Sequence, residues 1–182
     1  MHPWHDIPTG SDPAKAVNAV IEIPAGGKVK YEMDKRTGLL RLDRVLYSSV
    51  YYPANYGFIP RTLGDDGDAL DILVLMSEPV DPLTIVRAQP IGMLPMIDDA
   101  GGDEKILATC PDDPGFSDME DIDELPVHLL RQIERFFQDY KKLEGKEVET
   151  YEYVGAKETV QVIHDGRARY LEHFPERAWP GA

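Results

Sequence analysis

The chain has 182 residues, with 19 Lys and Arg against 33 Asp and Glu, so its formal net charge is −14. This length fits one domain, residues 1–182, that is large enough to bury a core. The acidic balance argues against a nucleic-acid-binding protein, which needs a basic surface, and the single cysteine excludes an internal disulfide.

The first part of the chain predicts strands separated by turns. Apolar runs bounded by glycine and proline favour strands over residues 17–23, 28–33, 39–46, 69–76, 84–97 and 105–109. Antiparallel strands that are joined by short turns and carry several prolines indicate a small barrel.

The later part of the chain predicts two helices. From Asp121 the apolar residues recur at helical spacing as far as Tyr140, and Pro126 suits a first turn. A weaker helical pattern follows over about residues 156–174, and residues 111–124 form a long acidic loop before the first helix.

Targeting and membrane signals are missing from the pattern. Residues 1–16 lack the basic start and apolar run of a signal peptide, and no stretch approaches the length of a membrane span. We therefore expect a soluble, cytoplasmic protein with no membrane partner.

The acidic segment 65–71 leads directly into an apolar strand. A turn at Gly67 brings Asp66 and Asp68 together, and the strand start directs Asp71 at them. A buried carboxylate must be neutralised, be paired or bind a cation. Closely packed oxygen ligands suit Mg²⁺, Mn²⁺ or Ca²⁺ rather than Zn²⁺. The alternative is a solvated turn rich in Asp and Gly.

A second acidic loop covers residues 98–105 and also follows the end of an apolar strand. It brings Asp98 and Asp103 together around glycines, this time with a lysine, Lys105. Two such loops in one small barrel favour a functional site over two solvated turns.

Cationic side chains occur on the predicted strands. Lys30 and Glu32 project from one side of their strand, about 6–7 Å apart. From this strand alone, a plain polar outer face is the favoured explanation. Arg44 shares the apolar face of its strand. There it needs an anion, which is either a phosphate or an internal carboxylate.

Tyrosines add possible hydrogen-bond donors. Tyr140 lies on the apolar seam of the first predicted helix, beside Lys141. Segment 51–58 is rich in loop-forming residues and contains Tyr52 and Tyr56. These hydroxyls either donate to phosphate or belong to ordinary aromatic packing, and Lys141 by itself also fits a solvated helix surface.

Together these motifs resemble the family I soluble inorganic pyrophosphatases, over about residues 17–145. The resemblance depends on the order and spacing of seven segments along the chain. These are residues 21–24, 30–32, 43–44, 52–57, 66–71, 98–105 and 140–141. The resemblance implies an α+β, mainly β fold with a five-stranded OB-like barrel flanked by two helices. It also implies that this short, prokaryotic-type form assembles as a homohexamer.

The activity implied by the resemblance is Mg²⁺-dependent hydrolysis of inorganic diphosphate to two orthophosphates by a metal-bridged hydroxide. It implies several Mg²⁺ ions per active site, with Mn²⁺ as a possible substitute. The implied catalytic residue is Asp68, which accepts a proton from the attacking water. The implied metal ligands are Glu32, Asp66, Asp71, Asp98 and Asp103. The implied substrate-binding residues are Lys30, Arg44, Tyr56, Lys105, Tyr140 and Lys141, with Glu22 and Tyr52 in support.

The chain departs from the family pattern at Ala69, where proline is usual, and at Pro95, where a basic residue is common. Two alternatives remain open. One is a metal-dependent phosphohydrolase of a larger phosphoanhydride, which the missing glycine-rich phosphate loop disfavours. The other is a non-catalytic acidic module that binds divalent cations, which leaves Lys30, Arg44 and Lys141 without a role.

Overall fold

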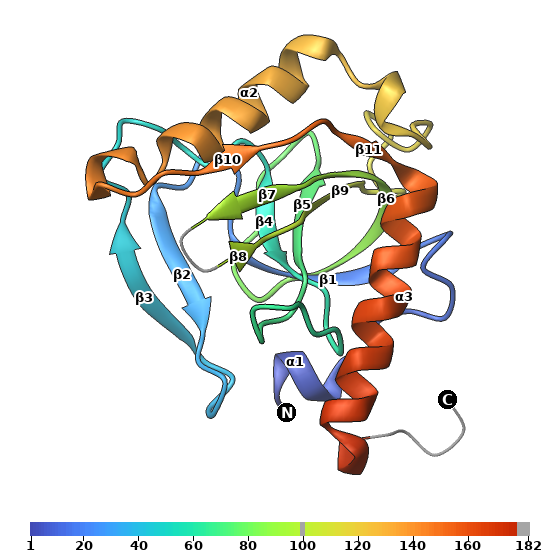
Figure 1. The fold of residues 1–182 in the computed structure, drawn as a ribbon. Coiled ribbons are helices and arrows are strands. Elements are labelled where there is room, and N and C mark those ends of the chain that lie inside the picture. The colour runs from blue at the N-terminus through green and yellow to red at the C-terminus, as the bar shows by residue number, and fades with distance from the viewer. Residues whose placement is uncertain (99–100, 178–182) are drawn as a thin grey trace.

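The computed structural model describes residues 1–98 and 101–177. Five strands close into a barrel (Figure 1). In hydrogen-bonded order they are β1 (Val17–Ile23), β4 (Asn55–Phe58), β5 (Asp71–Leu75), β9 (Lys105–Thr109) and β6 (Ile85–Leu94), and β6 pairs with β1. The mainly β barrel predicted from the sequence is therefore confirmed.

One pairing in the barrel differs from the antiparallel pattern expected. β5 and β9 run parallel, whereas the other barrel pairs are antiparallel. A parallel pair needs a long crossover connection. Here the chain leaves β5, forms β6, and returns to place β9 between β5 and β6.

Two of the predicted strands lie outside the barrel. β2 (Val29–Met33) and β3 (Leu40–Val45) form a separate two-stranded hairpin that projects from one side of the molecule (Figure 1). The short strands β7 (Met96–Asp98), β8 (Gly101–Gly102) and β10 (Glu149–Thr150) form a three-stranded sheet. β11 (Val154–Gly155) extends the barrel sheet beside β6.

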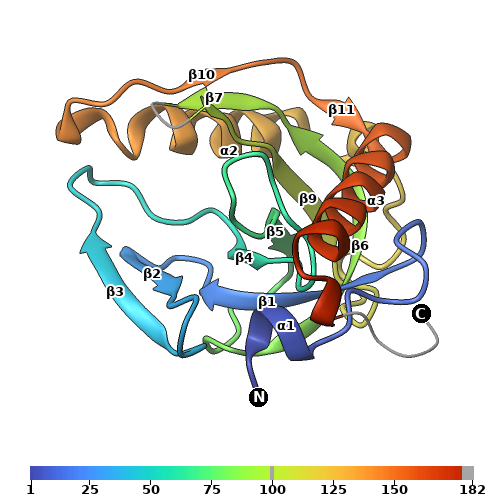
Figure 2. The same cartoon turned by 60° about the horizontal axis from the view of Figure 1, so that its bottom comes forward.

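Both predicted helices are present. α2 (Val127–Asp139) crosses one end of the barrel, and α3 (Ala156–His173) runs along its side, while a short helix that was not predicted, α1 (Pro3–Asp6), lies beside α3 (Figures 1 and 2). Single 3₁₀ turns occur at η1 (Ile122–Glu124), η2 (Lys142–Glu144) and η3 (Pro175–Arg177). Within the described residues, no helix is both long and apolar enough to cross a membrane.

The helices explain why β5 is apolar at consecutive positions. Leu73 packs in the core cluster that includes Phe137 of α2, and Ile72 packs in the cluster that includes Ile163 of α3. Successive side chains of a strand point to opposite faces. Both faces of β5 are therefore buried, and this buried strand holds Asp71 at its first residue.

β4 corrects the interpretation of segment 51–58 as a loop. Its four residues are buried and pair with both β1 and β5. A Cβ atom at Gly57 would lie 1.9 Å from the Val20 carbonyl oxygen, so only glycine lets β4 approach β1 this closely. Glycine and asparagine are poor strand formers in isolation, which is why the sequence pattern did not predict this strand.

Candidate active site

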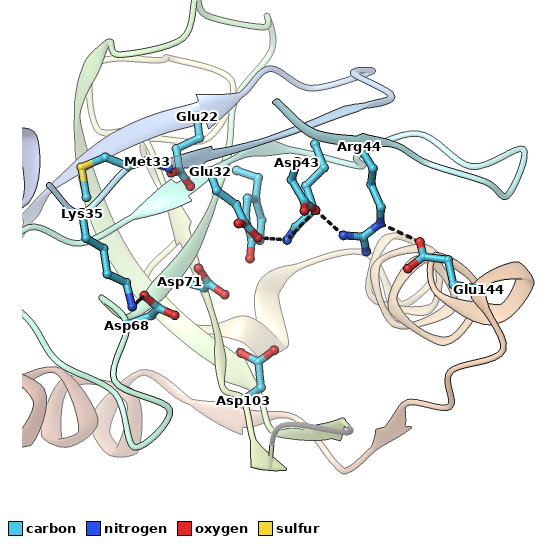
Figure 3. A network of polar contacts seen from close by, with 12 residues as sticks. Glu22, Glu32, Met33, Lys35, Asp43, Arg44, Asp68, Asp71, Asp103 and Glu144 are labelled. Atoms are coloured by element: carbon cyan, nitrogen blue, oxygen red, sulfur yellow. Dashed lines mark hydrogen bonds and ion pairs between the residues drawn. The ribbon is translucent and has the colours of Figure 1, made fainter. Parts of the chain in front are cut away.

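A cavity of about 410 Å³ lies between the β2–β3 hairpin, one end of the barrel and the end of α2. Most of the residues predicted for the site line it: Glu22, Lys30, Glu32, Tyr56, Asp66, Asp68, Asp71, Asp103, Lys105, Tyr140 and Lys141. Figure 3 shows Glu32, Asp68, Asp71 and Asp103 arranged around this space. Residues that are distant in the sequence therefore meet in one acidic cavity that also contains lysines.

Lys105 lies at the centre of the barrel end of the cavity. The parallel register places it opposite Asp71, and its ammonium group pairs with the carboxylates of Asp71 and, at 2.5 Å, Asp103. The lysine is only 2% exposed. Burial lowers the pKa of Lys105, but the charges of Asp71 and Asp103 outweigh it, so the pKa is raised and the ammonium stays charged.

A chain of ion pairs runs along the hairpin to the end of α2. The Lys30 ammonium pairs with Glu32 and lies 3.3 Å from Asp43, and Asp43 in turn pairs with Arg44. The Arg44 Nε atom donates to Glu144 at 2.7 Å (Figure 3). A bulge after Lys30 leaves Asp43 outside the pairing register, which brings the Lys30 and Arg44 positions opposite each other.

Asp68 is paired with a lysine that the sequence analysis did not identify. Lys35, in the turn after β2, pairs with the Asp68 carboxylate, and its ammonium also donates to the Gly67 carbonyl oxygen at 3.3 Å. Both carboxylate and lysine are more than half exposed, at 55% and 54%. This contact depends on the hairpin folding back over the acidic loop, so no local pattern in the sequence could have shown it.

The tyrosines of the site remain protonated. Burial is the main cause that raises the pKa of Tyr56 and of Tyr140, and nearby carboxylates add to the effect at Tyr56. The Tyr56 hydroxyl lies 3.4 Å from the Lys105 ammonium, within hydrogen-bonding distance. Both phenols line the cavity as neutral groups that can donate a hydrogen bond to an anion.

Glu22 is a buried carboxyl group at the edge of the cavity, 7% exposed, and it accepts a 2.7 Å hydrogen bond from the Met33 N–H. Burial raises the pKa of Glu22 to about 8, and the negative charge of Asp71 contributes to this rise. Burial, assisted by the nearby negative charge, therefore favours the neutral form of this carboxyl group.

Two of the described residues predicted for the site, Arg44 and Tyr52, do not line the cavity. Arg44 pairs with Asp43 and Glu144 beside it, and Tyr52 packs behind it, with its ring 5.2 Å from the ring of Tyr56. The side chain of Asp98 lies outside the part of the molecule that the structure describes. Conversely, the lining includes Lys35 and Trp4, neither of which was predicted.

The donor set of the cavity fits a hard divalent cation. Its carboxylate oxygens are the ligands that Mg²⁺ prefers, and thiol and imidazole groups, which would favour zinc, are absent from the described lining. Among the described residues, however, no three acidic, His or Cys side chains form a ready metal cluster. The carboxylates face lysines instead, so a cation would have to compete with Lys30, Lys35 and Lys105 for them.

Comparison with known proteins agrees with this geometry. A family model described as inorganic pyrophosphatase matches residues 19–171. The chain belongs to the inorganic pyrophosphatase family. The match begins inside β1 and ends near the end of α3, so it includes the barrel, the hairpin and both long helices.

Relatives extend over nearly the whole chain. It is 53% identical over 176 residues to soluble inorganic pyrophosphatase 2 of Chlamydomonas reinhardtii, which covers 97% of this chain and 92% of the relative. It is 55% identical over 162 residues to the soluble inorganic pyrophosphatase of Oryza sativa subsp. japonica, covering 89% and 76%. The crystal structure of inorganic pyrophosphatase from Thermus thermophilus matches with a TM-score of 0.88 at 37% identity, covering 92% and 98%. This inorganic pyrophosphatase fold supports the five-stranded barrel described above.

Proposed function

We propose that this chain hydrolyses inorganic diphosphate to two orthophosphates and that it uses Mg²⁺ as its cofactor. The observation that carries the proposal is the alternation of carboxylates and lysines around one cavity. Carboxylates attract divalent cations, and lysines attract phosphate. Membership of the inorganic pyrophosphatase family supports the same substrate.

The metal would be held by Glu32, Asp66, Asp71, Asp98 and Asp103. Mn²⁺ would be the closest substitute, because it takes the same hard oxygen ligands. When bound, such an ion supplies positive charge that offsets the negative charge of the phosphoryl oxygens in the transition state. The roles of these five carboxylates come from the resemblance, and the shared cavity supports four of them.

Asp68 would act as the general base. It lies in the loop before β5 and is more exposed than Asp71, at 55% against 27%. A half-exposed carboxylate can receive a proton from water in the cavity and pass it to solvent. Its partner Lys35 keeps the carboxylate oriented over the cavity.

The cations and phenols would hold the two phosphate groups. Lys30, Lys105 and Lys141 contribute positive charge to the cavity, and Tyr56 and Tyr140 contribute neutral hydrogen-bond donors. Arg44 would extend this set from the edge, while Glu22 and Tyr52 would support it from behind. Phosphoryl transfer depends mainly on positioning and charge stabilisation, which this arrangement supplies.

We also propose that the chain forms homohexamers in the cytoplasm, as its resemblance to the short family members implies. A largely apolar groove of about 760 Å³ between α2 and residues 49–53 supports self-association. Sedimentation velocity would test the hexamer, and a sharp monomer peak at micromolar concentration would contradict it. Imaging of a fluorescent fusion would test the compartment.

The reaction can be tested by ³¹P NMR. Incubation of diphosphate with the chain and Mg²⁺ should replace the diphosphate resonance with that of orthophosphate. A matched sample with excess EDTA should keep the diphosphate resonance. Persistence of diphosphate with a folded chain that binds Mg²⁺ would contradict the proposal and favour a non-catalytic cation-binding module.

A further inference from the structure

The N-terminal helix α1 reaches the candidate site, although it carries none of the predicted site residues. It lies between the loop that precedes β5 and the lower end of α3 (Figures 1 and 2). Trp4, in this helix, is 3% exposed and lines the cavity. The side chain also packs in a small core cluster with Phe58, against Met33 and Ala69. This cluster therefore joins α1 to the hairpin, the barrel and the acidic loop.

The first set of contacts joins α1 to the base of the acidic loop. The Trp4 indole N–H donates to the Thr62 carbonyl oxygen at 2.9 Å, and the Trp4 carbonyl oxygen accepts from the Arg61 N–H at 2.9 Å. The Thr62 hydroxyl in turn accepts a 3.0 Å hydrogen bond from the N–H of Leu70, the residue before Asp71. These bonds close the loop that carries Asp66 and Asp68, and they tie its first end to α1 directly and its second end through Thr62.

The second set joins α1 to the turn of the β2–β3 hairpin. The His2 Nε2 atom lies 3.0 Å from the Lys35 carbonyl oxygen, which can only accept, so Nε2 carries the proton. In the same turn Gly38 has φ +71°, and a Cβ atom there would lie 2.8 Å from Pro3. The turn is therefore packed closely on α1, and its Lys35 side chain reaches Asp68.

A third set fixes α1 to the rest of the molecule. The His5 ring is hydrogen-bonded to the buried Tyr170 hydroxyl of α3 at 2.7 Å. The Trp4 ring also contacts Phe174 edge-on, with centroids 5.5 Å apart. A short helix would be marginal by itself, but these contacts make α1 a fixed point against which the hairpin and the loop are both placed.

We infer that Trp4 and His2 are positioning residues that hold the hairpin and the acidic loop at the separation the site requires. The inference rests on the proposed function, in which Glu32 of the hairpin and Asp66 and Asp71 of the loop bind metal together. Groups that orient metal ligands from behind contribute strongly to affinity. Trp4 and His2 act through other residues and need not touch diphosphate.

The inference is tested with Trp4→Ala, Trp4→Phe and His2→Ala. Trp4→Phe keeps an aromatic ring but loses the N–H that donates to Thr62. His2→Ala loses the hydrogen bond to the hairpin turn and the ring contact with His5. We expect Trp4→Ala to weaken Mg²⁺ binding about tenfold in calorimetric titrations without substrate. KM for diphosphate should rise, with little change in kcat at saturating Mg²⁺. The two milder variants, Trp4→Phe and His2→Ala, should change Mg²⁺ affinity and KM in the same direction.

The matched control is Ile122→Ala. Ile122 is buried, packs over Gly92 of β6, and is not among the residues that line the cavity. The Ile122→Ala substitution should lower the free energy of unfolding, because it leaves a cavity in the core, while Mg²⁺ affinity and KM stay unchanged. If the folded Trp4 and His2 variants bind Mg²⁺ and diphosphate like the parent, this inference is overturned, while the proposed function is unaffected. A parent chain that neither binds Mg²⁺ nor releases orthophosphate would overturn the proposed function and this inference with it.

Discussion

Lys105 shows how single residues keep the site charged without a metal. Asp71 and Asp103 are partly buried, and a buried carboxylate that lacks a partner tends to take up a proton. The ammonium of Lys105 supplies this partner, because it pairs with both of them. The lysine itself stays charged, so the two carboxylates share one buried positive charge in the cavity.

Asp71→Asn tests this arrangement. The substitution removes a charge from the presumed metal site, so Mg²⁺ affinity should fall by about tenfold or more, as measured by calorimetric titration. Asp112→Asn is the matched control, because Asp112 forms an exposed pair with Arg87 and should bind Mg²⁺ like the parent. Near-parental Mg²⁺ affinity in Asp71→Asn would show that Asp71 is not a ligand.

Asp68→Asn tests the general base. The variant should bind Mg²⁺ almost normally but lose about 10²–10⁴-fold in kcat at neutral pH, because the amide cannot accept the proton of the attacking water. Steady-state rates measured beside Asp112→Asn would check this. An unchanged kcat would refute the assignment of Asp68.

The sequence predicted the acidic and basic residues of the cavity because each lies beside an apolar strand or helix seam that restricts where it points. Asp71 and Lys105, at the first residues of β5 and β9, are the clearest cases. Lys35 and Trp4 were not predicted, because their contacts with the site depend on how the hairpin and α1 pack. A local sequence pattern does not predict such contacts between residues that are distant in the chain.

At the scale of elements, β4 shows the limit of strand propensity. The helices and most strands followed from their apolar period, whereas β4 contains Asn55 and Gly57 and gave no strand signal. Its existence depends on close packing against β1 rather than on local preference. The hairpin strands β2 and β3 were predicted correctly as strands, but their position outside the barrel depends equally on tertiary packing.

Gly57→Ala should therefore destabilise the barrel strongly. A Cβ atom 1.9 Å from the Val20 carbonyl oxygen forces β4 away from β1, and we expect a loss of about 3 kcal/mol or more in the free energy of unfolding. Urea denaturation would measure it. Gly102→Ala is the control, since no atom lies within 4 Å of a Cβ there. Equal stability of the two variants would contradict the close approach of these strands.

The docking of α1 should depend on pH through His5. Burial lowers the pKa of His5 from 6.5 to about 4, with the charge of His2 adding to this effect. Between these values the unfolded chain binds a proton that the folded chain does not. The contribution of His5 to the free energy of unfolding should therefore fall as pH drops from 6.5 to 4, by at most about 1.4 kcal/mol per pH unit.

His5→Gln provides the check, because glutamine does not titrate. Urea denaturation at several pH values gives the free energy of unfolding as a function of pH. Between pH 6.5 and 4 its dependence on pH should differ between variant and parent, with more stability lost on acidification in the parent. Above pH 7 the two proteins should show similar slopes. Equal slopes between pH 6.5 and 4 would show that His5 is not buried as a neutral ring.

The whole molecule combines a strongly acidic surface with a few cations concentrated in one cavity. Its net charge of −14 would repel a diphosphate anion. Lys30, Lys105 and Lys141 offset part of the negative charge of the cavity, and bound Mg²⁺ would offset more of it. Apart from β4, the strands of the barrel and their limits could be predicted from the sequence, because apolar runs and proline positions specify them. The parallel pairing of β5 and β9 could not, because strand order is decided by the whole chain.

The most direct test is orthophosphate release from diphosphate with millimolar Mg²⁺, measured beside a metal-free sample and beside ATP under the same conditions. We expect rapid release that requires Mg²⁺ and leaves ATP intact. Release from ATP at a comparable rate would indicate a broader phosphohydrolase. No release from either, by a folded chain that binds Mg²⁺, would contradict the assignment of this cavity as a diphosphatase site.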